Sequence, residues 1–157
     1  MTGSTPNDRI GENGVLVLED GNFVVLSAAW NDRRGAATWV SGTAGLEGVV
    51  SAVNSLIGST SADYVGLNGY ALKAGAYVIG SPMWDEWDEG AIIVDVGALT
   101  FAKGRSPVGA VSAANSLVGS KSKDSVGTAV VLTSGAAYPA IVTARTRGPT
   151  PSAAWST

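Results

Sequence analysis

A ten-residue segment occurs twice in this chain and constrains the fold more than any other feature. Residues 51–60 (SAVNSLIGST) match residues 112–121 (SAANSLVGSK), and further segments align in the same order around both. We therefore interpret residues 1–157 as one domain built from three copies of a unit, the last copy incomplete. The copies span 3–57, 58–118 and 119–157, which gives periods of 55 (58 − 3) and 61 (119 − 58) residues.

Each copy is expected to form four short strands, because runs of β-branched and aromatic residues alternate with glycine-containing turns. The expected strands are 15–18, 22–27, 36–40 and 49–53 in the first copy; 69–72, 76–81, 98–102 and 110–114 in the second; and 129–132 and 138–143 in the third. Tight hairpin turns are expected at 19–21 and 73–75. The run at 112–117 (SAANSL) also suits a single helical turn capped by Ser112, although we expect a strand there.

The composition excludes several classes of function. Glycine is abundant, with 21 residues, and only 15% of residues are charged, as expected for short strands joined by turns. The net charge of −3 offers no electrostatic footprint for nucleic acid or anionic lipid. Histidine and cysteine are both absent, which removes the usual nucleophile–base pairs and zinc sites. We therefore expect no enzyme activity, no cofactor, no metal and no nucleic-acid partner. No apolar run is long enough to span a membrane.

The repeat resembles known families. The strings VSAANSLVGS, Asp-x-Val-Gly, YVIGSPMWD and Gly-Ala-x-Thr-Trp/Phe look like the tandem repeats of large bacterial filamentous-haemagglutinin-like surface proteins. More distantly, their order is similar to the FG-GAP blades of integrin α-subunits, although the calcium loop of those blades is missing here. The first resemblance implies a piece of a longer exported protein at the cell surface or outside the cell. The second implies a β-propeller in which each copy is one blade.

The expected fold is therefore all-β, with β-propeller-like four-stranded blades. A single four-stranded sheet cannot bury both of its faces, so each copy must pack on its neighbours. The chain carries about 2.7 blades, fewer than the four to eight of a closed propeller. We expect a homo-oligomer, such as a dimer that completes the ring. A β-trefoil, which closes as a monomer, is the alternative, and a β-solenoid fits the period poorly.

Aromatic and acidic side chains supply the candidate binding residues. Trp30 and Trp84 are equivalent in the alignment and are interpreted as core, with a sugar-stacking platform as the alternative. Trp39 and Phe101 form a second equivalent pair, also expected in the core. The segment 84–90 (WDEWDEG) lies in an insertion of the second copy, and binding residues concentrate on loops. The candidate ligand-binding residues are Trp84, Asp85, Trp87 and Asp88.

Other charged residues have simpler interpretations. Asp8, Asp63 and Asp124 recur just before a Val-Gly or Ile-Gly step, and carboxylates at such places usually accept backbone N–H bonds in a turn. Arg145 and Arg147 are interpreted as part of a solvated end.

The expected function is a non-enzymatic repeat module of a bacterial adhesin-type surface protein that binds carbohydrate or protein ligands through its loops. The alternative is a purely structural, self-assembling repeat scaffold with no ligand.

Overall fold

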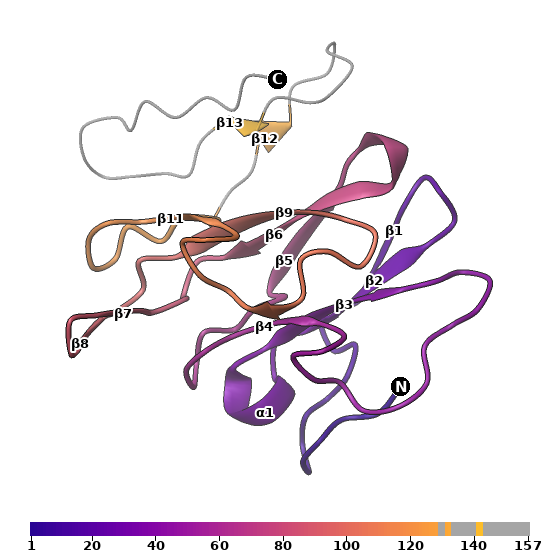
Figure 1. Cartoon of the computed structure of the whole chain (residues 1–157), viewed down its shortest axis with the longest axis horizontal. Coiled ribbons are helices and arrows are strands. Elements are labelled where there is room, and N and C mark those ends of the chain that lie inside the picture. Colours follow the sequence, from indigo (N-terminus) through magenta and orange to yellow (C-terminus); the bar gives the residue numbers. More distant parts are fainter. Residues whose placement is uncertain (129–130, 133–140, 143–157) are drawn as a thin grey trace.

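The computed structural model describes residues 1–128, 131–132 and 141–142 (Figure 1). Within them the chain is almost entirely β, which confirms the expected all-β class. The elements are β1 (Val15–Val17), β2 (Phe23–Ser27), α1 (Trp30–Arg33), β3 (Ala36–Val40), β4 (Leu56–Ile57), β5 (Asn68–Ala71), the 3₁₀ turn η1 (Lys73–Gly75), β6 (Ala76–Ser81), β7 (Glu86–Asp88), β8 (Ala91–Ile93), β9 (Ala98–Lys103), β10 (Gly109–Ala110), β11 (Leu117–Val118), β12 (Val131–Leu132) and β13 (Ile141–Val142).

Each of the first two copies makes its own four-stranded sheet. The first sheet runs in the order β1-β2-β3-β4 and is extended by β10, which pairs in parallel with β4. The second sheet runs β5-β6-β9-β11. Two further hairpins, β7–β8 and β12–β13, stand outside these sheets. The described strands close neither a propeller nor a barrel.

The two sheets pack face to face around one hydrophobic cluster. Val24 and Leu26 of β2 point toward the second sheet, and Tyr77 and Ile79 of β6 point back toward the first. Ile79 and Val24 are fully buried, and burying a side chain of this size contributes about 1.5–3 kcal/mol. In Figure 1 the sheets lie one above the other, with β3 below and β6 and β9 above. The physical expectation that copies must cover each other's apolar faces is therefore met.

The two sheets are stacked in the same orientation, so that equivalent faces point in the same direction. In the alignment Val24 of β2 corresponds to Val78 of β6. Val24 packs between the sheets, whereas Val78 lies in a second cluster on the opposite face of the second sheet, together with Leu99. The copies are thus related head to tail, and the same stacking operation can be repeated along the chain.

Phe101 corrects one core prediction. Trp39 packs against the cluster between the sheets, as expected, but Phe101 is 53% exposed. Its partner in the strand register is Val78, so Phe101 lies on the face of β9 that points away from the first sheet. Phe101 therefore lies on the same face of its sheet as the equivalent Trp39. The burial differs because only the first copy has a second sheet described against that face.

The expected fourth strands, 49–53 and 110–114, are wrong in position. Asn54 and Asn115 instead close compact turns: Ser55 N–H donates to Ser51 O at 3.0 Å, as in one turn of helix, and Ser116 does the same to Ser112. The fourth strand of each sheet follows the turn, as β4 and β11, and pairs antiparallel with the third strand.

The two turns are the same structure built twice. The Asn54 Oδ1 atom accepts the Ser51 N–H at 2.9 Å and its amide donates to Val49 O at 2.9 Å. Asn115 makes the equivalent two bonds, to Ser112 and Ala110, at 3.0 and 2.9 Å. This match confirms the internal duplication in three dimensions.

Of the third copy, residues 119–128 are described together with β12 and β13, which pair antiparallel and fall inside the expected strands 129–132 and 138–143. The expectation for Arg145 and Arg147 lies outside the described residues.

Candidate functional site

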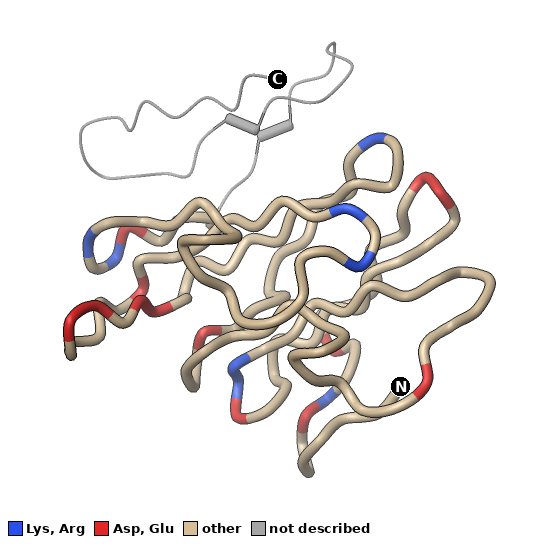
Figure 2. The backbone as a smooth tube through the Cα atoms, viewed as in Figure 1, with Lys and Arg blue, Asp and Glu red and all other residues tan. Residues whose placement is uncertain are grey.

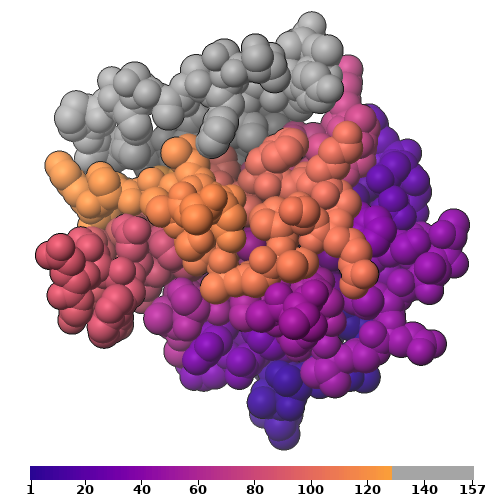
Figure 3. Space-filling model, viewed as in Figure 1, coloured from indigo at the N-terminus to yellow at the C-terminus, as the bar shows by residue number. Residues whose placement is uncertain are grey.

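A hairpin that the second copy carries and the first copy lacks is the candidate site. Five positions separate Trp30 from Gly35 in the first copy, but thirteen separate the equivalent Trp84 from Gly97. In the first copy the short connection is the tight turn α1. In the second copy the longer connection forms β7 and β8, an antiparallel pair that projects from one corner of the molecule (Figure 3).

The hairpin forms because its turn residues adopt the backbone conformation that a two-residue connection needs. Glu89 and Gly90 have φ values of 44° and 92°, and a type I′ turn needs positive φ at both central residues. The register places Trp87 opposite Ile92. Both side chains are therefore on one face of the hairpin, where cross-strand neighbours contact each other.

This face of the hairpin is open to solvent. Trp87 is 67% exposed and Ile92 is 48% exposed. Asp88 and Glu89 at the tip are also exposed. Figure 2 shows acidic segments along this hairpin. The arms thus present an indole and an isoleucine beside carboxylates, without a structural partner among the described residues.

The base of the hairpin, in contrast, is held rigidly. The Asp85 carboxylate accepts the Asp95 N–H at 2.8 Å, which ties the two ends of the insertion together. The Asp85 N–H donates to Asp63 Oδ1 at 3.1 Å. From the third copy, Lys123 N–H donates to Val94 O at 3.0 Å. An exposed tip on a fixed base is a suitable arrangement for a binding loop.

The structure therefore separates the four candidate residues into two groups. Trp84 is only 4% exposed and lies in the cluster between the sheets, and its equivalent Trp30 is equally buried in a separate, smaller cluster near the N-terminus. The interpretation of this pair as core is confirmed. Asp85 is engaged at the base of the hairpin, so only Trp87 and Asp88 lie on the exposed arm.

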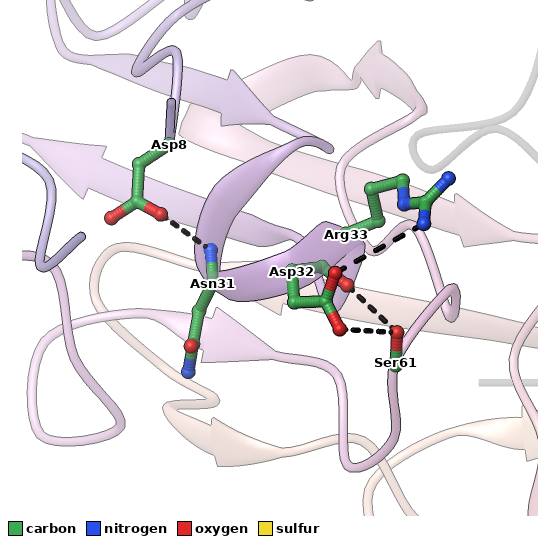
Figure 4. Close-up of polar contacts among 5 residues, drawn as sticks. All are labelled: Asp8, Asn31, Asp32, Arg33 and Ser61. Carbon is green, nitrogen blue, oxygen red and sulfur yellow. Dashed lines mark hydrogen bonds and ion pairs between the residues drawn. The ribbon is translucent and has the colours of Figure 1, made fainter. Parts of the chain in front are cut away.

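The three repeated aspartates accept backbone N–H bonds, as predicted. Asp63 accepts the N–H groups of Ser59 and Thr60 at 2.7 and 2.8 Å. Asp8 and Asp124 accept the equivalent groups of their own loops. Asp8 also accepts the Asn31 N–H at 2.8 Å (Figure 4), in the place where Asp63 accepts that of Asp85. Each aspartate thus fixes its own loop, and Asp8 and Asp63 also fix the residue that follows a buried tryptophan.

The pKa values of Asp8 and Asp63 shift in opposite directions, although the two carboxyl groups accept equivalent hydrogen bonds. Burial alone would raise the pKa of Asp8, but hydrogen bonds from Thr5, Asn31 and Ser4 outweigh it and lower the pKa from 3.8 to about 2. Asp63 lies between the first two copies, and there burial raises its pKa in spite of the equivalent hydrogen bonds.

We expect Asp8 to give the chain an acid-sensitive contribution to stability. Its folded pKa is below its unfolded value, so the contribution is present above pH 4 and is lost as the pH falls toward 2. The size is about 2 kcal/mol for a shift of this extent. The measurement is urea unfolding of the wild type and Asp8→Asn between pH 2 and 7. The difference between the two should shrink over that acid range, and a difference that stays constant with pH would contradict the assignment.

A shallow hollow of about 390 Å³ lies beside Asp8, and the sequence did not indicate it. It is lined by residues 5–9 together with Ala29, Asp32 and Arg33. Asn31, Asp32 and Arg33 all have positive φ, a conformation that Asn and Asp tolerate better than most residues. The hollow carries both signs of charge: Arg33 lies 4.0 Å from Asp32 Oδ1, and Arg9 pairs with Glu12 at 3.0 Å. It therefore has no clear charge preference for a ligand.

Comparison with known sequence families gives the chain a family. The profile of a repeat of unknown function, DUF5650, matches residues 17–67 and again residues 71–128. The chain belongs to the DUF5650 repeat family. No curated protein matches the chain.

The family unit is offset from the copies read from the sequence, and the offset has a structural meaning. The first DUF5650 match ends at residue 67, after the loop that carries Asp63, and the second ends at residue 128, after the loop that carries Asp124. Each unit therefore contains most of one sheet and the following loop, which packs back onto the end of that sheet through the bonds of Tyr64 and Val65 to Arg33 and Arg34.

Neither a cluster of metal ligands nor a membrane-spanning helix is found among the described residues. No cluster of three or more acidic, histidine or cysteine side chains there is arranged to hold a metal ion. No helix among the described residues is long and apolar enough to cross a membrane.

Proposed function

We propose that this DUF5650 protein is a non-enzymatic, adhesin-type repeat module that binds its ligand through the β7–β8 hairpin. One observation carries the proposal: Trp87 is 67% exposed on an element that the second copy contains and the first copy lacks. A position repeated in every copy serves the architecture. An inserted aromatic residue on an exposed arm has no such role among the described residues.

The chemistry of the hairpin suits a carbohydrate ligand, or a protein surface with similar polar and apolar groups. An indole ring stacks on the apolar face of a sugar. The exposed carboxylates of Asp88 and Glu89 can accept hydrogen bonds from hydroxyl groups around that face. No cofactor is needed for such binding. The resemblance to haemagglutinin-like repeats supports a place on the cell surface or outside the cell.

The sheets are proposed to act as propeller-like blades. The head-to-tail relation of the first two sheets supports this architecture, as does the strand order within each sheet. A complete ring would then require blades from more than one copy of the chain.

The binding proposal is tested on a glycan array. We expect Trp87→Ala to weaken binding at least five-fold, since stacking on an aromatic side chain is commonly worth about 1 kcal/mol. Phe101→Ala is the matched control, because Phe101 is also an exposed aromatic residue, on the second sheet rather than the hairpin. Binding that survives Trp87→Ala, or no binding to any glycan or host protein, would contradict the proposal.

A purely structural scaffold is the second candidate function. It is favoured by the partly open apolar face of the second sheet, where Phe101 lies beside the buried Leu99. Such a scaffold needs self-association and no ligand, so the mass of the chain in solution tests it directly. A stable monomer at every concentration would contradict it.

A further inference from the structure

One face of the β7–β8 hairpin is apolar and open to solvent. Trp87 and Ile92 lie opposite each other in the strand register and are 67% and 48% exposed. The other face differs, since Ile93, the next residue along β8, packs against the cluster between the two sheets. The hairpin is therefore fixed to the core by one face. It presents the other as an apolar surface that no described part of the chain covers.

The insertion that contains this hairpin also concentrates the negative charge of the chain. Residues 84–97 include five carboxylates and no basic residue. The rest of the chain has eight acidic and ten basic residues, so its formal charge is +2 (10 − 8), against −5 for the insertion. The equivalent connection of the first copy, residues 30–35, has one acidic and two basic residues. The negative charge thus belongs to the insertion and not to the repeat.

The described part of the molecule does not neutralise this charge. Its two ion pairs both lie outside the insertion. Lys123 approaches the base of the hairpin, but the contact is made by its backbone N–H, which donates to Val94 O. Asp88 and Glu89 at the tip are exposed, and acidic segments run along the hairpin in Figure 2. An apolar face with unpaired carboxylates around it is complementary to a ligand that combines apolar groups with positive charge.

We propose that the hairpin binds an arginine-rich segment of a partner protein. This proposal rests on the binding function proposed above and names its class of ligand. A guanidinium group stacks on an indole ring better than an ammonium group does, because it is planar and weakly hydrated. Glu86 and Asp88 are the chain neighbours of Trp87, so their carboxylates attract the same cation. Ile92 contacts the apolar stem of the arginine or the side chain beside it.

The distribution of the carboxylates favours a peptide over a sugar. From Glu86 to Glu89 they extend over roughly 10 Å of chain, at about 3.3 Å per residue. A neutral sugar leaves all of them unmatched. Arginines spaced along a peptide can meet several, and apolar residues between them can cover Ile92. A protein segment therefore uses both the charge and the apolar face of the hairpin.

Fluorescence anisotropy of a labelled peptide tests the proposal on the full chain. The probe is a decapeptide in which arginine alternates with valine. Its matched control carries citrulline in place of each arginine, which keeps the shape of the side chain and removes the charge. We expect the arginine peptide to bind about ten-fold more tightly or better at low salt, because several exposed ion pairs add up. Added salt should weaken this binding, since exposed charges are screened.

Variants of the hairpin show whether the peptide binds there. Trp87→Ala should weaken binding about five-fold, because the cation–π contact is lost. Asp88→Asn/Glu89→Gln should weaken it about three-fold or more at low salt. Asp20→Asn/Glu47→Gln is the matched control, since it removes the same two charges from exposed positions outside the hairpin, and it should leave the affinity unchanged. Equal losses for the two double variants, or equal affinities for the arginine and citrulline peptides, would overturn the proposal.

Oligosaccharide probes separate this proposal from the binding function on which it rests. Chitotetraose is neutral, and its deacetylated form is cationic. Binding of either sugar that requires Trp87, without binding of the arginine peptide, would overturn the proposal and leave the binding function standing. Failure of all these probes, together with no ligand on the glycan array or among host proteins, would contradict both. Self-association of the wild type that Asp88→Asn/Glu89→Gln abolishes would make a second copy of this chain the occupant, and would also overturn the proposal.

Discussion

Gly35→Ala is expected to lower the free energy of unfolding by about 3 kcal/mol or more. Gly35 has a φ of 79°, and an added Cβ atom would lie 2.2 Å from Val65 O and 2.3 Å from Val65 N. Both atoms belong to backbone, so no side chain can rotate away. The loop that contains Val65 would have to move, and the contact between the two copies would be disturbed. Urea unfolding, with the slope compared between variants, measures the change.

Gly21→Ala separates the steric effect from the backbone conformation. Gly21 has nearly the same φ, 82°, but nothing lies within 4 Å of its added Cβ atom. Its substitution should cost only the conformational preference, about 1 kcal/mol. Equal losses for the two variants would show that the close approach at Val65 has no energetic importance.

The repeat pattern predicted the larger part of the fold for a physical reason. The first three strands of each copy are marked by β-branched residues and by glycine turns, and these signals depend only on neighbouring residues. The expected hairpin turn at 19–21 is present, with Leu18 N–H bonded to Asn22 O at 2.9 Å. Because both sheets are built from matched segments, finding one copy was sufficient to place the other.

The fourth strand was misplaced because its signal is not local. Leu56 and Ile57 form only two residues of strand, too few for a period of two to be seen. The run before them has the composition of a strand, but the Asn54 amide bonds to backbone groups at Ser51 and Val49 and closes a turn. Short polar side chains compete with the β ladder in this way, and composition alone does not rank the two outcomes.

The candidate site was predicted as a segment but not as a geometry. The insertion and its two tryptophans were visible from the alignment of the copies. Which tryptophan faces solvent depends on the turn at Glu89 and Gly90 and on the register that follows from it. Trp84 precedes the insertion and is buried like the equivalent Trp30, whereas Trp87 lies within the insertion. The equivalence of Trp84 with Trp30 had already predicted that Trp84, unlike Trp87, belongs to the core.

The largest electrostatic effect is expected at Asp63. This side chain is fully buried and accepts the N–H groups of Ser59, Thr60 and Asp85 as well as the Thr60 hydroxyl at 2.6 Å. Asp63→Ala would remove the buried acceptor that these part-buried donors share, at about 1–3 kcal/mol for each donor that water cannot then reach. We expect a loss of about 3 kcal/mol or more at pH 7. The same change should loosen the base of the hairpin through Asp85.

Asp124→Ala is the internal control, because Asp124 occupies the same position in the third copy. It is less buried and accepts the N–H groups of Ser120 and Lys121, both at 3.0 Å. Its removal should cost about 1 kcal/mol, since water can replace the lost acceptor. Thermal unfolding measures both variants; for a chain of this size 1 kcal/mol corresponds to a shift of roughly 2–4 °C in Tm.

The pH dependence gives this prediction a sign as well as a size. Burial raises the folded pKa of Asp63, so its ionisation opposes folding, and that cost appears as the pH rises from 3.8 through the folded pKa. Removing the carboxyl group therefore removes a cost at pH 7 together with the hydrogen bonds. The penalty of Asp63→Ala should be larger at pH 3.5 than at pH 7, if the protonated acid still accepts its N–H bonds. If the loss of unfolding free energy caused by Asp63→Ala is instead smaller in acid, those bonds require the carboxylate. The contact between the two copies then depends on the charge of Asp63.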